Sequence, residues 1–202
     1  ELLRLMGVVN GIPGGTYNPA GTLSRGEFCK MSVSALDRAD EEPAQRGRTI
    51  YLDVGPSHWA RGYINLASTI TLGAGSNGEG GTALVAGLGD GTFQPDRPIT
   101  YGEAVTILCR VLGYGVSDVA TGGAWYDGYL SAAASIGLTD GLSLSGADVI
   151  DRGQAAILFY NLYFSKSKGS DKTYLVAQGG SEVEGGVVLD TDATADDGST
   201  GA

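Results

Sequence analysis

Three segments of the chain place a charged or aromatic residue at the predicted first position of a helix. They are residues 22–28 (TLSRGEF), 98–104 (PITYGEA) and 149–155 (VIDRGQA). The start of a helix has free N–H groups and a partial positive charge, so it attracts anions. An arginine at this point adds a bidentate, charge-assisted grip on a carboxylate. Arg25 and Arg152 are therefore candidates to bind an anionic ligand, and Tyr101 holds the same position in the second segment.

Helix stability alone does not favour an arginine at this position. A cation in the first turn opposes the helix dipole and costs roughly 0.3–1 kcal/mol. Its side chain is free to point outward, toward a bound anion. The alternative is a surface arginine that pairs with a neighbouring Asp.

The residues around this position form a helix-capping pattern. Each segment has a good N-cap residue, followed three residues later by Glu or Gln. The pairs are Ser24 with Glu27, Thr100 with Glu103, and Asp151 with Gln154. This capping box gives the acidic residue a structural role, so we do not assign it a catalytic one.

The same segments belong to a longer internal repeat. Residues 11–28 (GIPGGTYNPAGTLSRGEF) align without gaps on residues 87–104 (GLGDGTFQPDRPITYGEA), and residues 141–155 form a shorter third copy. An upstream half repeats as well, since residues 51–67 resemble residues 116–133. Each unit is predicted to be a helix, a glycine-rich loop and a second helix. Three amphipathic second helices predict a shared central bundle and a mainly α fold.

Composition excludes several classes of function. The net charge is −10 and no basic stripe is present, which argues against binding to nucleic acid. No apolar run approaches the ~18 residues of a membrane span. One His and two Cys give no metal site of the usual kind and little for acid–base catalysis, so we expect neither a metal or other cofactor nor an enzyme. Cys29 and Cys109 are expected to be buried free thiols, with a disulfide as the alternative.

Residues 1–164 resemble S-layer homology repeats. Copy two contains LDVGPSHWA, GDGTFQPD and ITYGE, which follow the family's aspartate-valine start, its His-Trp-Ala helix, its glycine-rich loop and its Thr-Arg-Ala-Glu helix start. The resemblance implies a pseudo-threefold spindle around a central helical bundle. It also implies grooves that bind the secondary cell-wall polysaccharide of Gram-positive bacteria, often through a pyruvylated sugar.

The resemblance transfers glycan-binding roles to individual residues. Arg25 and Arg152 match the motif arginine, and Tyr101 replaces it in copy two. The other matching positions are Trp59, Trp125, Asp53, Asp118, Gly11, Gly87 and Gly141. Alternatives stay open: the tryptophans as core residues, the aspartates as helix caps, and the glycines as C-caps with positive φ.

The repeat boundaries divide the chain into predicted units. They are a first repeat at 1–39 that lacks its N-terminal half, a linker at 40–50, a second repeat at 51–115 with a loop insertion at 73–86, a third repeat at 116–164, and a hinge and acidic linker at 165–202. Within the last unit, residues 173–178 are predicted to form a short strand.

The sequence thus predicts a wall-anchoring module at the extracellular cell surface. It would hold a larger surface protein to anionic, pyruvylated wall polysaccharide without covalent attachment. The alternative is a structural subunit whose repeats assemble copies of the protein into an S-layer lattice or filament.

Overall fold

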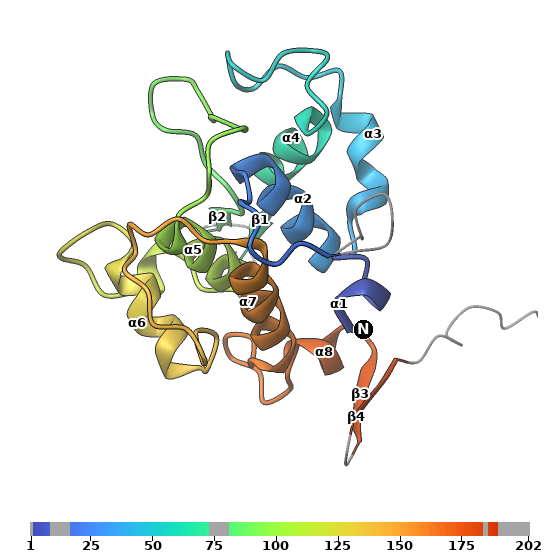
Figure 1. Ribbon diagram of the computed structural model, residues 1–202, viewed down its shortest axis with the longest axis vertical. Helices are drawn as coiled ribbons and strands as arrows, with labels where there is room; N and C mark the ends of the chain where they lie inside the picture. Colours follow the sequence, from blue (N-terminus) through green and yellow to red (C-terminus); the bar gives the residue numbers. More distant parts are fainter. Residues whose placement is uncertain (1, 9–16, 73–80, 184–185, 190–202) are drawn as a thin grey trace, which may run out of the picture.

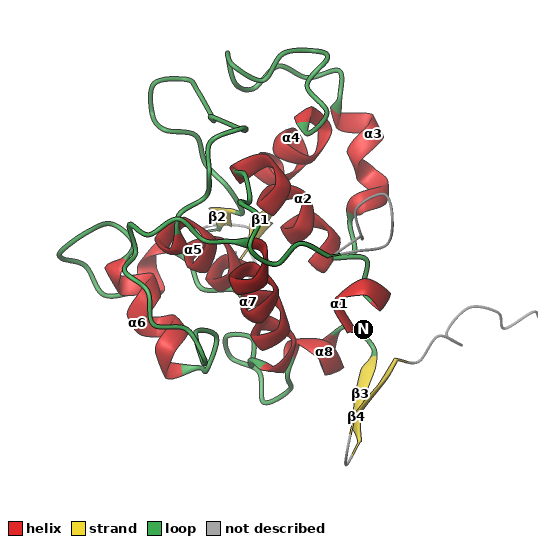
Figure 2. Ribbon diagram, viewed as in Figure 1, coloured by secondary structure: helices red, strands yellow, loops and turns green. Residues whose placement is uncertain are grey.

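The computed structural model describes residues 2–8, 17–72, 81–183 and 186–189. Most of the described chain is helical or in long loops, as Figure 2 shows, so the mainly α prediction is confirmed. Gly11 and most of the predicted insertion at 73–86 lie outside the described residues. The short strand β1 (Thr71–Leu72) precedes that insertion and pairs in antiparallel register with β2 (Thr82–Ala83), which lies within it.

The predicted second helices are α2 (Arg25–Ala35), α5 (Tyr101–Val111) and α7 (Arg152–Phe164). Ser24, Thr100 and Asp151 are their N-caps. In each case the N-cap side chain accepts the backbone N–H of the third helical residue, whose own side chain accepts the N-cap N–H. The three capping boxes are therefore confirmed, and they fix where each helix begins.

These helices form the centre of the molecule, with α7 beside α5 in Figure 1. The rings of Phe28 on α2 and Phe159 on α7 lie 5.0 Å apart between centroids. Both rings are fully buried, as is Leu108 on α5. An apolar centre shared by all three helices explains why none of them needs a long hydrophobic stretch.

Backbone hydrogen bonds join the helix starts in a cyclic order. Arg25 N–H donates to the Arg97 carbonyl (2.9 Å) and Gly26 N–H to that of Pro95 (2.8 Å). The corresponding donors of α5 bind loop carbonyls of copy three, and those of α7 bind loop carbonyls of copy one. These bonds are Tyr101 to Asp148, Gly102 to Gly146, Arg152 to Gly21 and Gly153 to Pro19. Each helix start thus satisfies two free N–H groups on the next copy's loop.

The first helices lie outside this centre. α4 (Arg61–Thr69) packs on α2, and α6 (Asp127–Ser135) packs on α5. The predicted linker at 40–50 is not an extended connection, because it contains the turn η1 (Ala39–Glu41) and the helix α3 (Glu42–Gln45). Asn65 donates to the carbonyls of Gln45 and Arg48, so this segment is packed against α4.

The C-terminal part differs from two expectations. The predicted strand at 173–178 is instead a short helix, α8 (Tyr174–Ala177), capped by Thr173. Burial of Tyr174 and Leu175 against the domain overrides the strand propensity of this segment. Part of the predicted acidic linker forms the antiparallel strands β3 (Gly180–Val183) and β4 (Gly186–Leu189), which project from the body in Figure 1. The remaining short elements are α1 (Leu2–Leu5) and η2 (Val116–Asp118).

Cys29 and Cys109 are buried free thiols, so the disulfide alternative is wrong. Burial raises the pKa of each thiol to about 12. Neither cysteine is therefore a reactive group at neutral pH. Among the described residues, no helix is both long and apolar enough to cross a bilayer.

Candidate ligand-binding clefts

Two clefts in the described structure are built to one plan, and each takes residues from three copies. The Arg25 cleft has a volume of about 350 Å³, and the Arg152 cleft one of about 240 Å³. The first is lined by Arg25, Val85, Ala86, Gly87, Leu88, Glu103, Thr106, Ile107, Arg110 and Trp125. The second is lined by Val8, Leu23, Glu27, Lys30, Met31, Trp59 and Arg152.

Equivalent positions of the repeat line both clefts. Each cleft has a motif arginine from one copy, the capping glutamate of the next copy's helix, and a tryptophan from the copy after that. These sets are Arg25, Glu103 and Trp125 in the first cleft, and Arg152, Glu27 and Trp59 in the second. The cyclic packing of the helix starts is what brings these distant residues together.

Arg25 does not point outward, contrary to the expectation for a first helical position. The residue is only 6% exposed. Its Nη1 donates to Glu103 Oε1 (2.5 Å), its Nε to the Phe93 carbonyl (2.9 Å) and its Nη2 to the Ala86 carbonyl (3.2 Å). Its guanidinium carbon also lies 4.5 Å from the centroid of the Phe93 ring. The anion that stabilises this arginine is therefore a carboxylate of the protein itself.

Glu103 is held by two arginines. Arg97 Nη2 also donates to Glu103 Oε1 (2.5 Å), while Glu103 Oε2 accepts the Thr100 N–H (3.0 Å). Burial disfavours the charged form of Glu103, but Arg25, the Thr100 N–H and Arg97 outweigh it and lower the pKa of this carboxyl. Burial also lowers the pKa of Arg25, although Glu103 opposes that shift. The group is thus an ionised, buried Arg25–Glu103 pair with a second, partly exposed arginine, Arg97.

Arg152 is more accessible than Arg25. Its side chain is 20% exposed, and Nη1 makes one contact of 3.2 Å to Glu27 Oε1. Its Nε is buried and has no hydrogen-bond partner. The Tyr17 ring lies 5.6 Å from the guanidinium carbon, which leaves the arginine between an aromatic face and a carboxylate.

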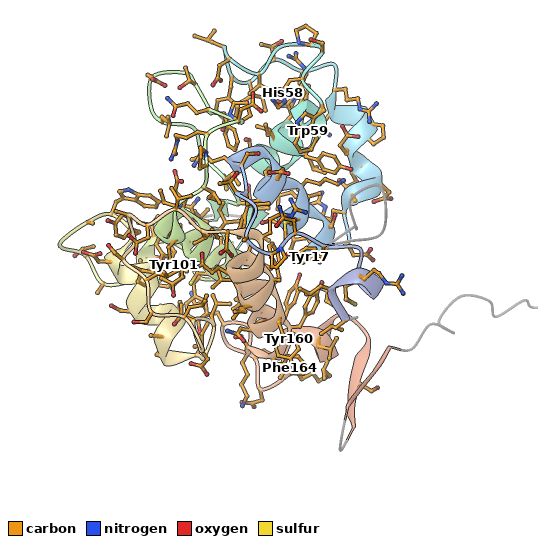
Figure 3. The ribbon with its side chains drawn as sticks, viewed as in Figure 1. Tyr17, His58, Trp59, Tyr101, Tyr160 and Phe164 are labelled. Carbon is orange, nitrogen blue, oxygen red and sulfur yellow. The ribbon has the colours of Figure 1, made fainter. Side chains whose placement is uncertain are left out.

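The tryptophans face solvent beside the clefts. Trp59 is 51% exposed and Trp125 is 62% exposed, so the core interpretation of these residues is wrong. Figure 3 shows Trp59 beside His58, where the two rings stack 6.0 Å apart between centroids. A half-exposed indole at the edge of a cleft is free to pack on an apolar face of a ligand.

Parts of the repeat are similar to a known domain family. Two segments match the S-layer homology domain. They are residues 6–29 and 82–105, which contain the starts of α2 and α5. The third copy found in the sequence is not among the matched segments.

Full-length relatives are also surface proteins by name. The chain is 28% identical over 141 residues to a "Surface layer protein" of Brevibacillus choshinensis, and 29% over 136 residues to a "Middle cell wall protein" of Brevibacillus brevis. It is 29% identical over 157 residues to a "Cell surface protein" of Thermoanaerobacter kivui. These alignments cover 70%, 67% and 77% of this chain but only 11%, 12% and 18% of the relatives.

A third set of equivalent residues differs from those of the Arg25 and Arg152 clefts. Tyr101 stands where Arg25 and Arg152 stand, and Gln154 stands where Glu103 and Glu27 stand. Tyr101 is buried at the start of α5, where Figure 3 labels it. Arginine and glutamate are thus both replaced by uncharged residues in the same set.

Asp53 and Asp118, which the resemblance suggests as glycan ligands, line neither the Arg25 nor the Arg152 cleft. Asp53 accepts the backbone N–H groups of Phe93 (2.8 Å) and Gln94 (2.7 Å), so it ties down the loop of its own copy. Asp118 accepts the Gly115 N–H (2.7 Å) and pairs with Lys168. The alternative of a cap on the first helix is also wrong, because Ala60 and Tyr126 hold the N-cap positions of α4 and α6.

Different structural constraints require glycine at the two described loop positions, Gly87 and Gly141. Gly87 lines the Arg25 cleft without a positive φ, and a Cβ there would lie 2.5 Å from Tyr51 Cε1 and 2.6 Å from the Thr92 carbonyl oxygen. Close packing therefore explains Gly87, and the C-cap alternative is wrong for it. Gly141 has φ of +80° with open space around its Cα, so the turn requires it. Gly11 lies outside the described residues.

Sequence reasoning missed three polar residues that line the clefts, Lys30, Thr106 and Arg110, and it gave Glu27 and Glu103 only a capping role. A signal was present, because Thr106 and Arg110 follow Glu103 at intervals of three and seven residues, on the same helix face. Within the described residues, no group of three or more His, Cys, Asp or Glu side chains is arranged to hold a metal ion.

Proposed function

We propose that this chain is a non-covalent anchor that holds a surface protein to an anionic cell-wall polysaccharide. The observation that carries the proposal is the repeated cleft, in which a cation-rich wall meets an exposed tryptophan. The Arg25 cleft has two arginines and one glutamate, and the Arg152 cleft has one arginine, one lysine and one glutamate. Each therefore has one excess positive charge in a chain whose net charge is −10.

The proposed ligand is a sugar that carries a carboxylate, as a pyruvylated terminal residue does. The cations would bind the carboxylate, and the indole would pack on the apolar face of the sugar ring. Two clefts on one rigid body allow two sugars of one polymer to bind together, which raises overall affinity without new contacts.

The similarity to S-layer homology domains and to cell-surface proteins supports this function and an extracellular location at the cell wall. The aligned regions make up less than a fifth of the length of these relatives, so the larger surface protein that the chain would hold is part of this proposal. Three tandem repeats arranged as a pseudo-threefold spindle form part of this proposal. The cyclic hydrogen bonds at the helix starts support it.

Co-sedimentation tests the proposal. The protein is mixed with purified cell-wall sacculi, with sacculi from which mild acid has removed pyruvate, and with peptidoglycan stripped of its secondary polysaccharide. We expect pelleting only with the untreated sacculi, and weaker pelleting at high salt because the attraction is electrostatic. Equal pelleting with all three preparations would show that the anionic sugar is not the ligand.

A second function is assembly between protein chains. The similarity to a relative named "Surface layer protein" supports this alternative. Light scattering without glycan separates the two functions. A concentration-dependent increase in particle size would favour assembly, and a constant monomer would favour anchoring alone.

A further inference from the structure

Arg110 occupies the junction between two cavities. Near the end of α5 it lines the Arg25 cleft, and it also lines a neighbouring cavity of about 310 Å³ that includes Val119 and Tyr129. Trp125 is the other residue that lines both cavities. A ligand that packs on Trp125 from either side would therefore lie close to the Arg110 guanidinium.

Arg110 has unused donor capacity at this junction. Its Nη1 donates to the carbonyls of Ala83 (3.1 Å) and Leu84 (3.4 Å), which holds the end of β2 against α5. The Nε is buried and has no hydrogen-bond partner. No salt bridge within the described residues joins Arg110 to a carboxylate. A buried donor without a partner costs free energy, which a ligand that accepts from it would recover.

Copy three shows that the loop-holding task needs no charge. Asn161 follows Gln154 by seven residues, as Arg110 follows Glu103. Its Nδ2 donates to the carbonyls of Leu138 (3.1 Å) and Asp140 (2.9 Å), two loop carbonyls in the corresponding part of the repeat. A neutral amide thus performs the same loop-holding work, so that task does not explain the positive charge of Arg110. The guanidinium carbon of Arg110 lies 5.6 Å from the centroid of the Tyr129 ring, a contact that leaves its remaining N–H groups without a carboxylate among the described residues.

Thr106, one turn before Arg110 on α5, is a second unpartnered group in this wall. It is 2% exposed, and its Oγ1 has no hydrogen-bond partner. Residues four apart on a helix lie on the same face, so the Thr106 hydroxyl and the Arg110 Nε–H belong to one surface of the cleft. Lys30 stands at the position of Thr106 in the Arg152 cleft, so the two clefts present different groups there.

We propose that Arg110, and not the motif residue Arg25, binds the negative charge of the ligand in the Arg25 cleft. Arg25 is buried and its charge is paired with Glu103, while two carbonyls accept from it as well. Arg110 has an unpartnered Nε and no carboxylate partner among the described residues. The ligand carboxylate accepts from the Arg110 guanidinium, the Thr106 hydroxyl binds an adjacent sugar oxygen, and Trp125 covers the ring. This inference rests on the proposed function and names the residues that select the anionic sugar in one of its clefts.

The variant Arg110→Asn tests the inference, because Asn161 shows that asparagine performs the structural task in copy three. Calorimetric titration with polysaccharide released from purified sacculi is compared for the wild type, Arg110→Asn and Arg48→Asn. Arg48 is an exposed arginine outside both clefts, so its variant controls for the change in net charge. We expect roughly 10- to 100-fold weaker binding for Arg110→Asn, the range of a hydrogen bond to a charged group. Arg48→Asn should bind as the wild type does.

The outcomes separate this inference from the proposed function. No binding by the wild type would overturn the anchoring function. Wild-type affinity in a folded Arg110→Asn variant would overturn the inference and leave anchoring intact. If Arg110→Asn fails to fold, nuclear magnetic resonance of the wild type decides, with the Arg110 Nε–H signal assigned through bonds from its backbone. A shift of that signal with polysaccharide, absent after removal of pyruvate, supports the inference, and an unchanged signal overturns it.

Discussion

The Arg25 and Arg152 clefts use the same motif residue in opposite ways. Arg25 is buried and donates to a carboxylate and two carbonyls, whereas Arg152 makes one longer contact to Glu27 and keeps an unpartnered Nε. The short motif therefore places an arginine at the first position of the helix. Contacts from the neighbouring copy then decide whether its guanidinium stabilises the fold or remains available to a ligand.

A single loop position accounts for much of this difference. Arg97 gives Glu103 a second cation, and its carbonyl accepts the Arg25 N–H. Gly21 is the equivalent acceptor for Arg152, and it has no side chain to add to the pair. A Cβ at position 21 would lie 3.3 Å from Cδ of Arg152, so the glycine also makes room for that arginine. Because copy one has a glycine at this loop position, no second cation from there pairs with Glu27 as Arg97 pairs with Glu103.

The largest expected effect separates the two arginines by stability. Arg25→Ala leaves Glu103 buried with one partly exposed partner, and we expect a loss of about 3–5 kcal/mol in the free energy of unfolding. Arg152→Ala removes a single, more exposed contact and should cost about 0–1 kcal/mol. Urea denaturation measures both values. Equal losses would contradict the division between a structural and an available arginine.

The third set of residues provides a smaller test. Tyr101→Arg alone should destabilise the protein, because it places a cation in a buried site without a carboxylate. Adding Gln154→Glu should restore part of the loss, since that residue is equivalent to Glu103. A double-mutant cycle in urea should give a favourable coupling of about 0.5–3 kcal/mol. Additive effects would show that the two residues do not face one another as their equivalents do.

The pH dependence of stability tests the Glu103 pair. Because the pKa of Glu103 is lowered on folding from its ordinary value of 4.5, its carboxylate stabilises the fold at neutral pH and this contribution is lost as pH falls through the folded-state pKa. Wild-type stability should therefore fall below pH 4.5, and Glu103→Gln should flatten the fall. The same scan in 0.5 M salt is the control, since a buried pair is screened only weakly.

The smallest expected change in stability is at the tryptophans. Trp59→Ala and Trp125→Ala remove half-exposed side chains, so the free energy of unfolding should change by no more than about 0.5 kcal/mol. Pelleting with sacculi should weaken for each variant, because each cleft loses its aromatic wall. Unchanged pelleting by the double variant would mean that the indoles do not contact the glycan.

The repeated helix starts could be predicted from the sequence because capping is local. Ser24, Thr100 and Asp151 with their partners three residues later specify the same geometry in every copy. Cys29 and Cys109 were also predicted, from their places on the same helices, to be buried free thiols, and this is confirmed. By contrast, the helical state of residues 174–177 depends on packing of Tyr174 against the domain, which a six-residue pattern does not contain.

The site could be predicted only in part, because its contacts cross between copies. The arginine and tryptophan positions followed from the repeat, but the pairing of Arg25 with Glu103 joins residues 78 positions apart. Which N–H groups of Arg110 find acceptors depends on where the carbonyls of Ala83 and Leu84 lie. The sequence likewise does not reveal that both carboxylate oxygens of Asp53 accept backbone N–H groups of a loop 40 residues later.

The cyclic bonds at the helix starts have a consequence for how the chain is made. The acceptors of the Arg152 and Gly153 N–H groups are Gly21 and Pro19, so the start of α7 completes a loop that lies far before it in the chain. Such long-range closure slows folding and delays it until almost the whole repeat region has emerged from the ribosome. A fragment that stops after copy two would leave the donors of α5 and the loop of copy one without partners, so this region should melt in a single transition rather than copy by copy.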